Sequence, residues 1–161
     1  VYQLKVMLNA LGLYKAGGTL TPRMADANLF TSDGVAAVND VTARDLQKLH
    51  RQWFLGKSLD GFCPMGPHVV TVDEVDVADL QVKCWVNGEL RQNANTAQLI
   101  FDVPTLIQSI SAGITLMPGD LIATGTPAGV GIGFTPPRFL KPGDLVRIEI
   151  QHLGVLENTI G

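Results

Sequence analysis

The sequence predicts an α+β fold in which short strands outnumber the helices. The clearest strand is residues 80–86, where apolar and polar side chains alternate with the period of two that a half-buried strand requires. The Asn87-Gly88 pair that follows is a two-residue turn of the kind that joins antiparallel strands. Helical signals are confined to a few stretches, chiefly residues 42–50 and 100–112. We therefore expect a β-rich fold with two or three helices.

Size and composition narrow the class of protein. The chain has 161 residues, 46% of them hydrophobic and 17% charged, which is typical of one globular domain with a sizeable core. The net charge of −3, without a basic cluster, argues against a nucleic-acid partner. No apolar run approaches the ~18 residues of a membrane-spanning helix. The two cysteines, Cys63 and Cys84, show no metal-binding spacing, which favours a reduced, cytoplasmic setting.

Residues 1–33 are the least regular part of the chain. Glycine and proline interrupt every periodic pattern there, so we expect short elements joined by turns. The first apolar stretch carries only Lys5 as an early charge. We interpret it as folded structure or the end of a fragment and not as a signal peptide.

The next segment predicts a buried strand followed by a helix. Residues 35–38 form a small apolar run that fits a buried strand ending near Asp40. A helix over residues 42–50 should follow, with Thr42 or Asp40 as its N-cap. Its inner face would be formed by two leucines, Leu46 and Leu49.

The remainder reads as strands around one further helix. Strands are expected at residues 68–72, 80–86, 89–92, 121–124 and 145–150, with residues 153–158 closing a final hairpin. Residues 93–96 should form a polar turn. The helix over residues 100–112 has Asp102 as a candidate N-cap, Pro104 in its first turn and Gly113 as a stop. Its buried stripe would be Leu106, Ile107 and Ile110.

A polar cluster between residues 39 and 67 is the main candidate site. Asp40, Arg44 and Gln47 follow the spacing that stacks side chains on one face of a helix. A carboxylate, a guanidinium and an amide aligned in this way can hold a metal and orient an anionic substrate. Simpler interpretations remain open: Asp40 as a helix cap, Arg44 paired with an aspartate, and Gln47 as plain surface. Lys57 would ordinarily be exposed, although the preceding glycine allows its ammonium to turn inward.

The glycine-rich loop of residues 125–131 is a second candidate. Backbone amides and the Thr126 hydroxyl suit a carboxylate or phosphate, although a tight structural turn explains the loop equally well. The loop lacks the Gly-Lys-Ser/Thr ending of a P-loop, and the chain has no Gly-x-Ser-x-Gly elbow. We expect Cys63 to be a small buried thiol. The three histidines should be surface or packing residues: His50, His68 and His152.

Five blocks in unbroken order resemble the fumarylacetoacetate hydrolase family, in particular its C-terminal catalytic domain. The resemblance runs from about Gly34 to the end of the chain. The blocks are NDVTARDLQ, GKSLDGFCPMGP, VNGELRQNANTAQLIFDVPTLIQSIS, TLMPGDLIATGTPAGVG and FLKPGDLVRIEIQHLGVLEN. The resemblance implies a β-rich mixed sheet roll over residues 34–161, with residues 1–33 as a partly represented N-terminal segment.

The resemblance also implies an activity. Family members use a divalent metal, usually Mg²⁺ or Mn²⁺, are commonly homodimers, and cleave or rearrange carbon–carbon bonds next to 2-oxo or 1,3-dioxo acids. Carried onto this chain, Asp40 resembles the metal-binding aspartate, and Arg44 and Gln47 would help hold the oxyanion. Lys57 would touch substrate or metal-bound oxygens, and Thr126 would bind the carboxylate of a small carboxylic-acid substrate. The expected reaction is hydrolysis or decarboxylation of a 2-oxo or 2,4-dioxo acid.

The chain departs from the family pattern at its start. The family's remaining metal ligands, a Glu-x-Glu pair, and its His and Glu dyad lie upstream of the aspartate. Here no glutamate precedes Glu74 and no histidine precedes His50. Three explanations are open: segments absent from the given sequence, a degenerate family member, or ligands from a neighbouring chain. The alternative function is a non-catalytic binding or structural protein with the family fold.

Overall fold

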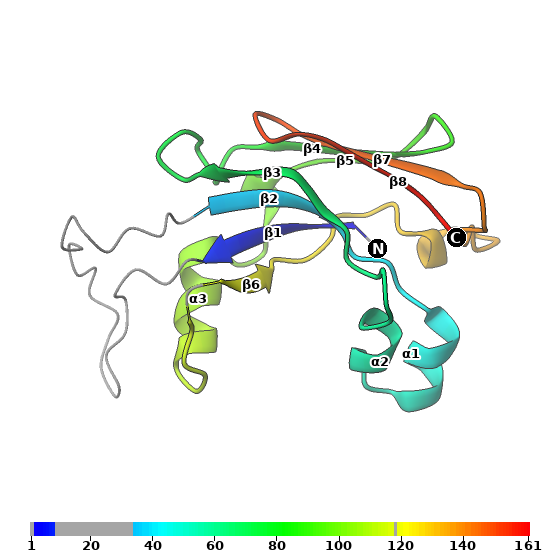
Figure 1. The fold of residues 1–161 in the computed structure, drawn as a ribbon, viewed down its shortest axis with the longest axis horizontal. Coiled ribbons are helices and arrows are strands. Elements are labelled where there is room, and N and C mark those ends of the chain that lie inside the picture. The colour runs from blue at the N-terminus through cyan, green and yellow to red at the C-terminus, as the bar shows by residue number, and fades with distance from the viewer. Residues whose placement is uncertain (1, 9–33, 118) are drawn as a thin grey trace.

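Two four-stranded antiparallel sheets face each other, with the helices at their margins (Figure 1). The structure is a computed structural model that describes residues 2–8, 34–117 and 119–161. The strand order is β3-β2-β1-β6 in one sheet and β5-β4-β7-β8 in the other. Every described strand pair is antiparallel, which confirms the expected α+β, β-rich fold.

The bounds of the elements follow the sheets. The first sheet consists of β1 Tyr2–Leu8, β2 Gly34–Asn39, β3 Met65–Thr71 and β6 Asp120–Ala123. The second consists of β4 Gln81–Val86, β5 Glu89–Asn95, β7 Leu145–Ile150 and β8 Gly154–Thr159. The helices are α1 Arg44–His50, α2 Phe54–Lys57 and α3 Val103–Ser111, with 3₁₀ turns η1 Thr96–Gln98 and η2 Gly131–Gly133. No helix in the described part of the chain has the length and apolar character needed to cross a membrane.

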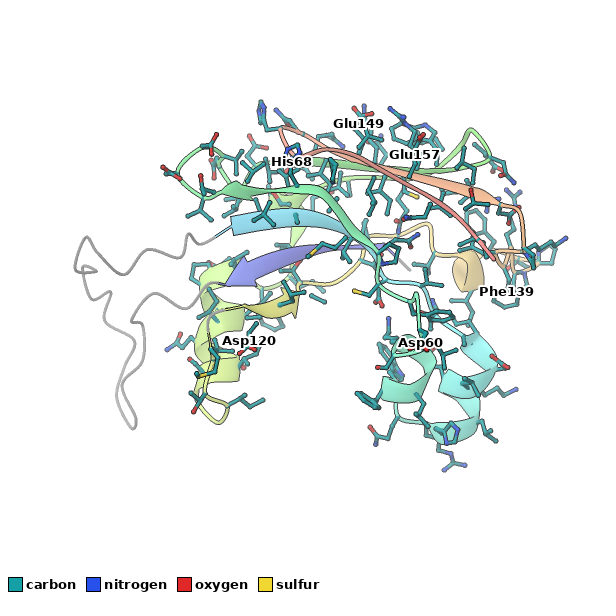
Figure 2. All side chains as sticks on the ribbon, in the orientation of Figure 1. Asp60, His68, Asp120, Phe139, Glu149 and Glu157 are labelled. Carbon is teal, nitrogen blue, oxygen red and sulfur yellow. The ribbon has the colours of Figure 1, made fainter. Side chains whose placement is uncertain are left out.

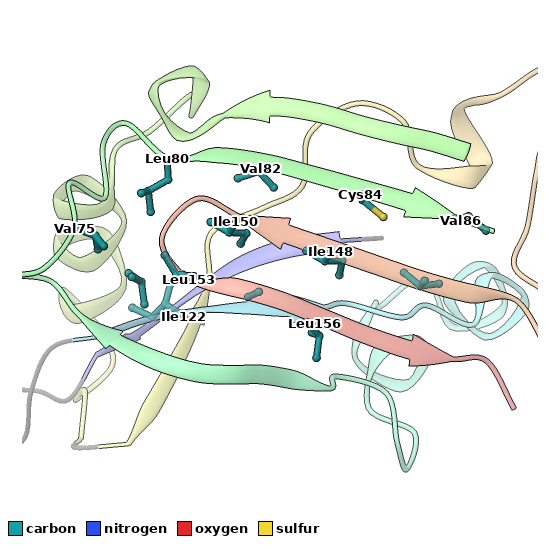
Figure 3. Close-up of a cluster of buried hydrophobic side chains, with 13 residues drawn as sticks. Val75, Leu80, Val82, Cys84, Val86, Ile122, Ile148, Ile150, Leu153 and Leu156 are labelled. Carbon is teal, nitrogen blue, oxygen red and sulfur yellow. The ribbon is translucent and has the colours of Figure 1, made fainter. Parts of the chain in front are cut away.

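The core fills the space between the two sheets (Figure 3). The alternation predicted for residues 80–86 is confirmed: the buried face comprises Leu80, Val82, Cys84 and Val86. Opposite side chains on β7 and β8 complete the layer, and burial of each large aliphatic residue stabilises the fold by roughly 1.5–3 kcal/mol. β2 is buried along its whole length, as its small apolar run predicted.

The predicted turn at Asn87-Gly88 joins β4 to β5. Both residues have positive φ, 51° and 81°, which is the geometry of a two-residue hairpin with the strands' own twist. The Asn87 side chain also donates to Asp144 (2.9 Å) and accepts from the Leu145 amide (2.9 Å). The hairpin is thereby tied to the turn that begins β7.

Helix α3 begins where its cap predicts. The Asp102 carboxylate accepts from the Thr105 amide at 2.9 Å, so the helix starts at Val103 and not at Ile100. Ile107 and Ile110 are half-buried and pack against the core.

The helix predicted over residues 42–50 is shorter and less buried than expected. It starts at Arg44 with Ala43 at the cap position, where no side chain bonds the free amides. Neither proposed cap is correct, because the Thr42 hydroxyl donates to the Asp40 carbonyl oxygen instead. The expected inner face is also wrong: Leu49 is 72% exposed. The helix extends away from the sheets and packs on α2, so it has no core to cover (Figure 1).

Two further differences concern β5 and β1. The turn expected at residues 93–96 is instead the end of β5 and the start of η1, because Asn95 and Gln98 cap each other's backbone amides. β1, which the sequence did not reveal as a strand, lies between β2 and β6 and pairs Tyr2 with Asn39. The other elements expected before Gly34 lie outside the described residues. The domain division at residue 33 stays a prediction.

Candidate active site

Asp40 and Lys57 form a partly buried ion pair at the end of β2. The strand delivers Asp40 to a position where its side chain is 11% exposed, and the Lys57 side chain is 19% exposed. The Lys57 ammonium donates to Asp40 Oδ2 and, at 3.3 Å, to Thr42 Oγ1. The ammonium is therefore turned inward and not exposed, the arrangement that a preceding glycine permits.

Gly56 explains how Lys57 reaches this position. The Ala43 amide donates to the Gly56 carbonyl at 2.8 Å, which holds α2 tightly against the start of α1. A Cβ at Gly56 would lie 2.9 Å from the Ala43 carbonyl oxygen and 3.0 Å from the Gln47 amide nitrogen. Only glycine fits this approach without a backbone shift. The Trp53 ring, 5.8 Å from the Lys57 ammonium, adds a cation–π contact.

Arg44 and Gln47 lie together on one face of α1, as their spacing predicted. The Arg44 guanidinium donates to Gln47 Oε1 at 2.7 Å. Burial lowers the pKa of Arg44, and the charge of Asp40 opposes that shift. Gln47 Nε2 is buried without an acceptor among the described residues. An amide donor in that state is suited to an oxygen of a bound ligand.

Thr126 is positioned by a residue that the sequence analysis did not select. Gln92, only 1% exposed, donates from Nε2 to Thr126 Oγ1 (3.1 Å) and to the Pro127 carbonyl (2.9 Å). The available signal was register: Gln92 lies opposite the buried Cys84, so a polar side chain faces the core. Thr126 lines a hollow of about 550 Å³ whose other walls are mostly apolar.

The predicted residues thus form three hydrogen-bonded groups. Lys57 joins Asp40 and Thr42, Arg44 joins Gln47, and the bond described for Thr126 runs to Gln92. The Coulombic effect of Asp40 on Arg44 links the first two groups electrostatically.

The remaining candidates have no place in this arrangement. The three histidines are exposed, as expected. Cys63 is half-buried and not buried as predicted, since it lies in the irregular segment just before β3.

The donor set around Asp40 does not fit a metal held by protein ligands alone. No group of three or more His, Cys, Asp or Glu side chains that could hold a metal occurs in the described part of the chain. The strand beside Asp40 is β1, and its sequence YQLKVML contains no carboxylate. Asp40 is also committed to Lys57. It is a single candidate ligand, fewer than the one or two carboxylates plus substrate oxygens typical of Mg²⁺ only if a substrate completes the site.

Comparisons with known proteins agree on one family. Residues 23–161 match the family described as fumarylacetoacetate (FAA) hydrolase C-terminal. The chain is 49% identical over 153 residues to the oxaloacetate tautomerase YisK of Bacillus subtilis (strain 168), covering 94% of this chain and 50% of that protein.

Solved structures share the fold. A fumarylacetoacetate hydrolase from the psychrophilic Exiguobacterium antarcticum superposes with a TM-score of 0.83 at 48% identity, covering 99% of this chain and 55% of that one. The 2-hydroxyhepta-2,4-diene-1,7-dioate isomerase from Mycobacterium marinum gives a TM-score of 0.76 at 39% identity, covering 98% and 56%. The chain therefore belongs to the fumarylacetoacetate hydrolase family, and it spans about half the length of the curated relatives it matches.

Proposed function

We propose that this family member carries the active-site portion of an enzyme that stabilises the enolate of a 2-oxo or 2,4-dioxo acid. The proposed reaction is carbon–carbon bond cleavage by hydrolysis or decarboxylation. The observation that carries the proposal is the Lys57 ammonium, held partly buried between Asp40 and Thr42. A fixed cation in a partly desolvated position stabilises developing negative charge without reorganisation.

Each neighbouring group has a role in this proposal. Asp40 keeps the ammonium in one position, so that its remaining N–H groups address the substrate oxygen. Arg44 and Gln47 supply further donors to the oxyanion, and their mutual hydrogen bond fixes the orientation of both side chains. In the carbon–carbon cleavage itself, the electron pair of the breaking bond passes into the carbonyl, and these donors stabilise the resulting enolate oxygen.

Thr126 is the proposed ligand of the substrate carboxylate. Because its oxygen accepts from Gln92, the hydroxyl retains its hydrogen as a donor. The apolar hollow beside it would accommodate the non-polar part of the acid.

Mg²⁺ or Mn²⁺ at Asp40 is part of the proposal as a binding equilibrium only. A divalent metal, when bound, polarises a 2-oxo acid, but we assign no step to it because the described carboxylates do not complete its ligand set. Calorimetric titration of Mg²⁺ with and without oxalate tests this part. Binding that oxalate strengthens and that Asp40→Asn removes supports a metal at Asp40, and binding unchanged in Asp40→Asn excludes it.

A second candidate is tautomerisation of a 2-oxo acid, favoured by the name of the 49% identical relative. It requires the same enolate but breaks no carbon–carbon bond. Proton NMR of the products distinguishes the two: cleavage releases a smaller acid, whereas tautomerisation changes only the keto–enol ratio and proton exchange. A cytoplasmic homodimer, implied by the family resemblance, completes the proposal. The non-catalytic alternative predicts no turnover at all.

The decisive experiment compares Lys57→Ala with Lys48→Ala in the purified protein, using oxaloacetate and an acylpyruvate. Lys48 is exposed on α1 and is a matched control. We expect Lys57→Ala to lower turnover on the order of 10²-fold or more, and Lys48→Ala to leave it unchanged. Retained turnover in a folded Lys57→Ala protein would remove Lys57 from the mechanism. Wild-type protein inactive on both acids and on their tautomerisation would favour the non-catalytic alternative.

A further inference from the structure

A second hollow of about 750 Å³ lies between the start of α1 and the loop that contains η2 (Figure 1). Its volume falls in the range of small-molecule sites. Its lining carries four basic side chains, Arg44, Arg91, Arg138 and Lys141, and two acidic ones, Asp45 and Asp144. No role in the proposed reaction has been given to Arg91 or Arg138.

Arg91 is placed by an irregularity in the second sheet. Cys84 pairs with Gln92 and Trp85 with Leu90, so Arg91 is the extra residue of a β-bulge. Bulges turn a side chain out of the regular alternation of a strand. The glycine-rich loop crosses the bulge closely: a Cβ at Gly129 would lie 1.8 Å from the Arg91 carbonyl oxygen. This glycine is therefore required by packing against Arg91.

Arg138 is placed by the same loop. Its amide donates to the Gly131 carbonyl at 2.8 Å, and a Cβ at Gly131 would lie 2.3 Å from the Arg138 carbonyl oxygen. The Phe134 ring lies 5.2 Å from the Arg91 guanidinium and 4.9 Å from that of Arg138, so one ring contacts both cations. The two glycines and the ring together fix two arginines at the edge of one hollow.

The charges around the hollow are not balanced. Arg91 and Arg138 share a single carboxylate, Glu89, at 3.2 and 2.6 Å. Asp144 is engaged elsewhere, by the Asn87 side chain and the Lys141 backbone amide, and these hydrogen bonds lower its pKa.

Arg91 Nε is in addition an orphan donor. It is buried without an acceptor among the described residues, although the side chain as a whole is only 14% exposed. A buried donor without a partner destabilises a protein by roughly 1–3 kcal/mol. An excess of cations and an orphan guanidinium donor both favour an oxyanion in this position.

We propose that this hollow is an anion-binding pocket in which Arg91 and Arg138 recognise a carboxylate or phosphate group of a small molecule. The planar, multi-donor guanidinium suits both groups. Two sources have this chemistry: a second acidic group of the acid bound near Arg44, or a separate small anion. The proposal concerns binding and holds whichever reaction the enzyme performs.

The test is calorimetric titration of succinate and of inorganic phosphate into the wild-type protein, Arg91→Gln, Arg138→Gln and Arg147→Gln. Arg147 is the matched control, since it also pairs with a glutamate and contacts an aromatic ring, Trp85, but lies outside the hollow. We expect millimolar or tighter binding of at least one anion, weakened about tenfold or more in either of the first two variants and unchanged in Arg147→Gln. Arg138, 49% exposed, serves as the variant least able to perturb the fold.

Two results would overturn the proposal: no binding of either anion by the wild-type protein, or binding that persists unchanged in folded Arg138→Gln. A competition arm identifies the source of the anion. Displacement of bound succinate by oxaloacetate indicates a second acidic group of the substrate, and independent binding indicates a separate anion. Loss of turnover in Lys57→Ala does not bear on these titrations, so the two proposals fail separately.

Discussion

The second sheet and the α1–α2 region are built on opposite principles. In the sheet, β4 and β7 bury one apolar face completely and leave charged residues such as Glu149 on the other (Figure 2). In the α1–α2 region the single buried helical residue of the described elements is Gly56, while Leu49 and Phe54 are more than 70% exposed. The sheet is held by area removed from water, and the helices are held by close backbone contact and charge pairing.

This difference separates stability from chemistry. The residues with candidate chemical roles lie at the ends of strands and on short helices, where few apolar contacts resist local opening. Asp40 is the exception that connects the two, because it follows directly on the fully buried β2. Substitutions in the two regions should therefore separate into effects on unfolding and effects on turnover.

The largest expected effect on stability is in the sheet. Ile148→Ala, at a side chain only 1% exposed, should lower the free energy of unfolding by about 2–5 kcal/mol through lost burial and a residual cavity. Urea denaturation measures it. Glu149→Gln on the neighbouring exposed position should change stability by less than about 0.5 kcal/mol. Equal losses in both variants would show that the core is not concentrated between the sheets.

A smaller effect on stability and a larger one on activity is expected at Gly56. Gly56→Ala places a methyl group against the Ala43 carbonyl and must move α2, and with it Lys57. Stability should fall by about 1 kcal/mol, and turnover by on the order of tenfold to a hundredfold, because misplaced catalytic groups lose effective orientation.

Gly113→Ala is the control for this substitution. A Cβ at Gly113 meets no atom within 4 Å, so stability and turnover should both be preserved. If Gly56→Ala retains full turnover, the position of Lys57 does not depend on the close approach of the two helices.

The smallest effect concerns the cap of α3 and depends on pH. Hydrogen bonding to Thr105 lowers the pKa of Asp102 below its ordinary value of 3.8. The carboxylate therefore stabilises the fold above pH ~4, and this contribution is lost as the pH falls through the lower, folded pKa. Asp102→Ala should lower the Tm slightly at neutral pH, with the difference shrinking in acid.

Asp102→Asn separates capping from charge. Asparagine caps helices as well as aspartate but does not titrate in this range. Its Tm difference from Asp102→Ala should persist in acid. A difference from Asp102→Ala that disappears at low pH for both wild type and Asp102→Asn would exclude titration of Asp102 as the cause.

Local signals in the sequence determined much of this protein. Period-two alternation predicted β4 and its buried face, the Asn87-Gly88 pair predicted the hairpin, and Asp102 predicted the start of α3. These features depend on neighbours in sequence, through backbone geometry and capping, and so can be read without a structure. The ordered blocks likewise identified the family.

Only the tertiary structure decided which polar groups meet. The pairing of Asp40 with Lys57, the bond from Gln92 to Thr126 and the approach of Gly129 to Arg91 each join residues far apart in the chain. Spacing within a helix could not reveal them, nor show that Leu49 faces water, because burial depends on what another element covers. Contacts between distant segments follow from how the sheets and helices pack, and no local pattern encodes that packing.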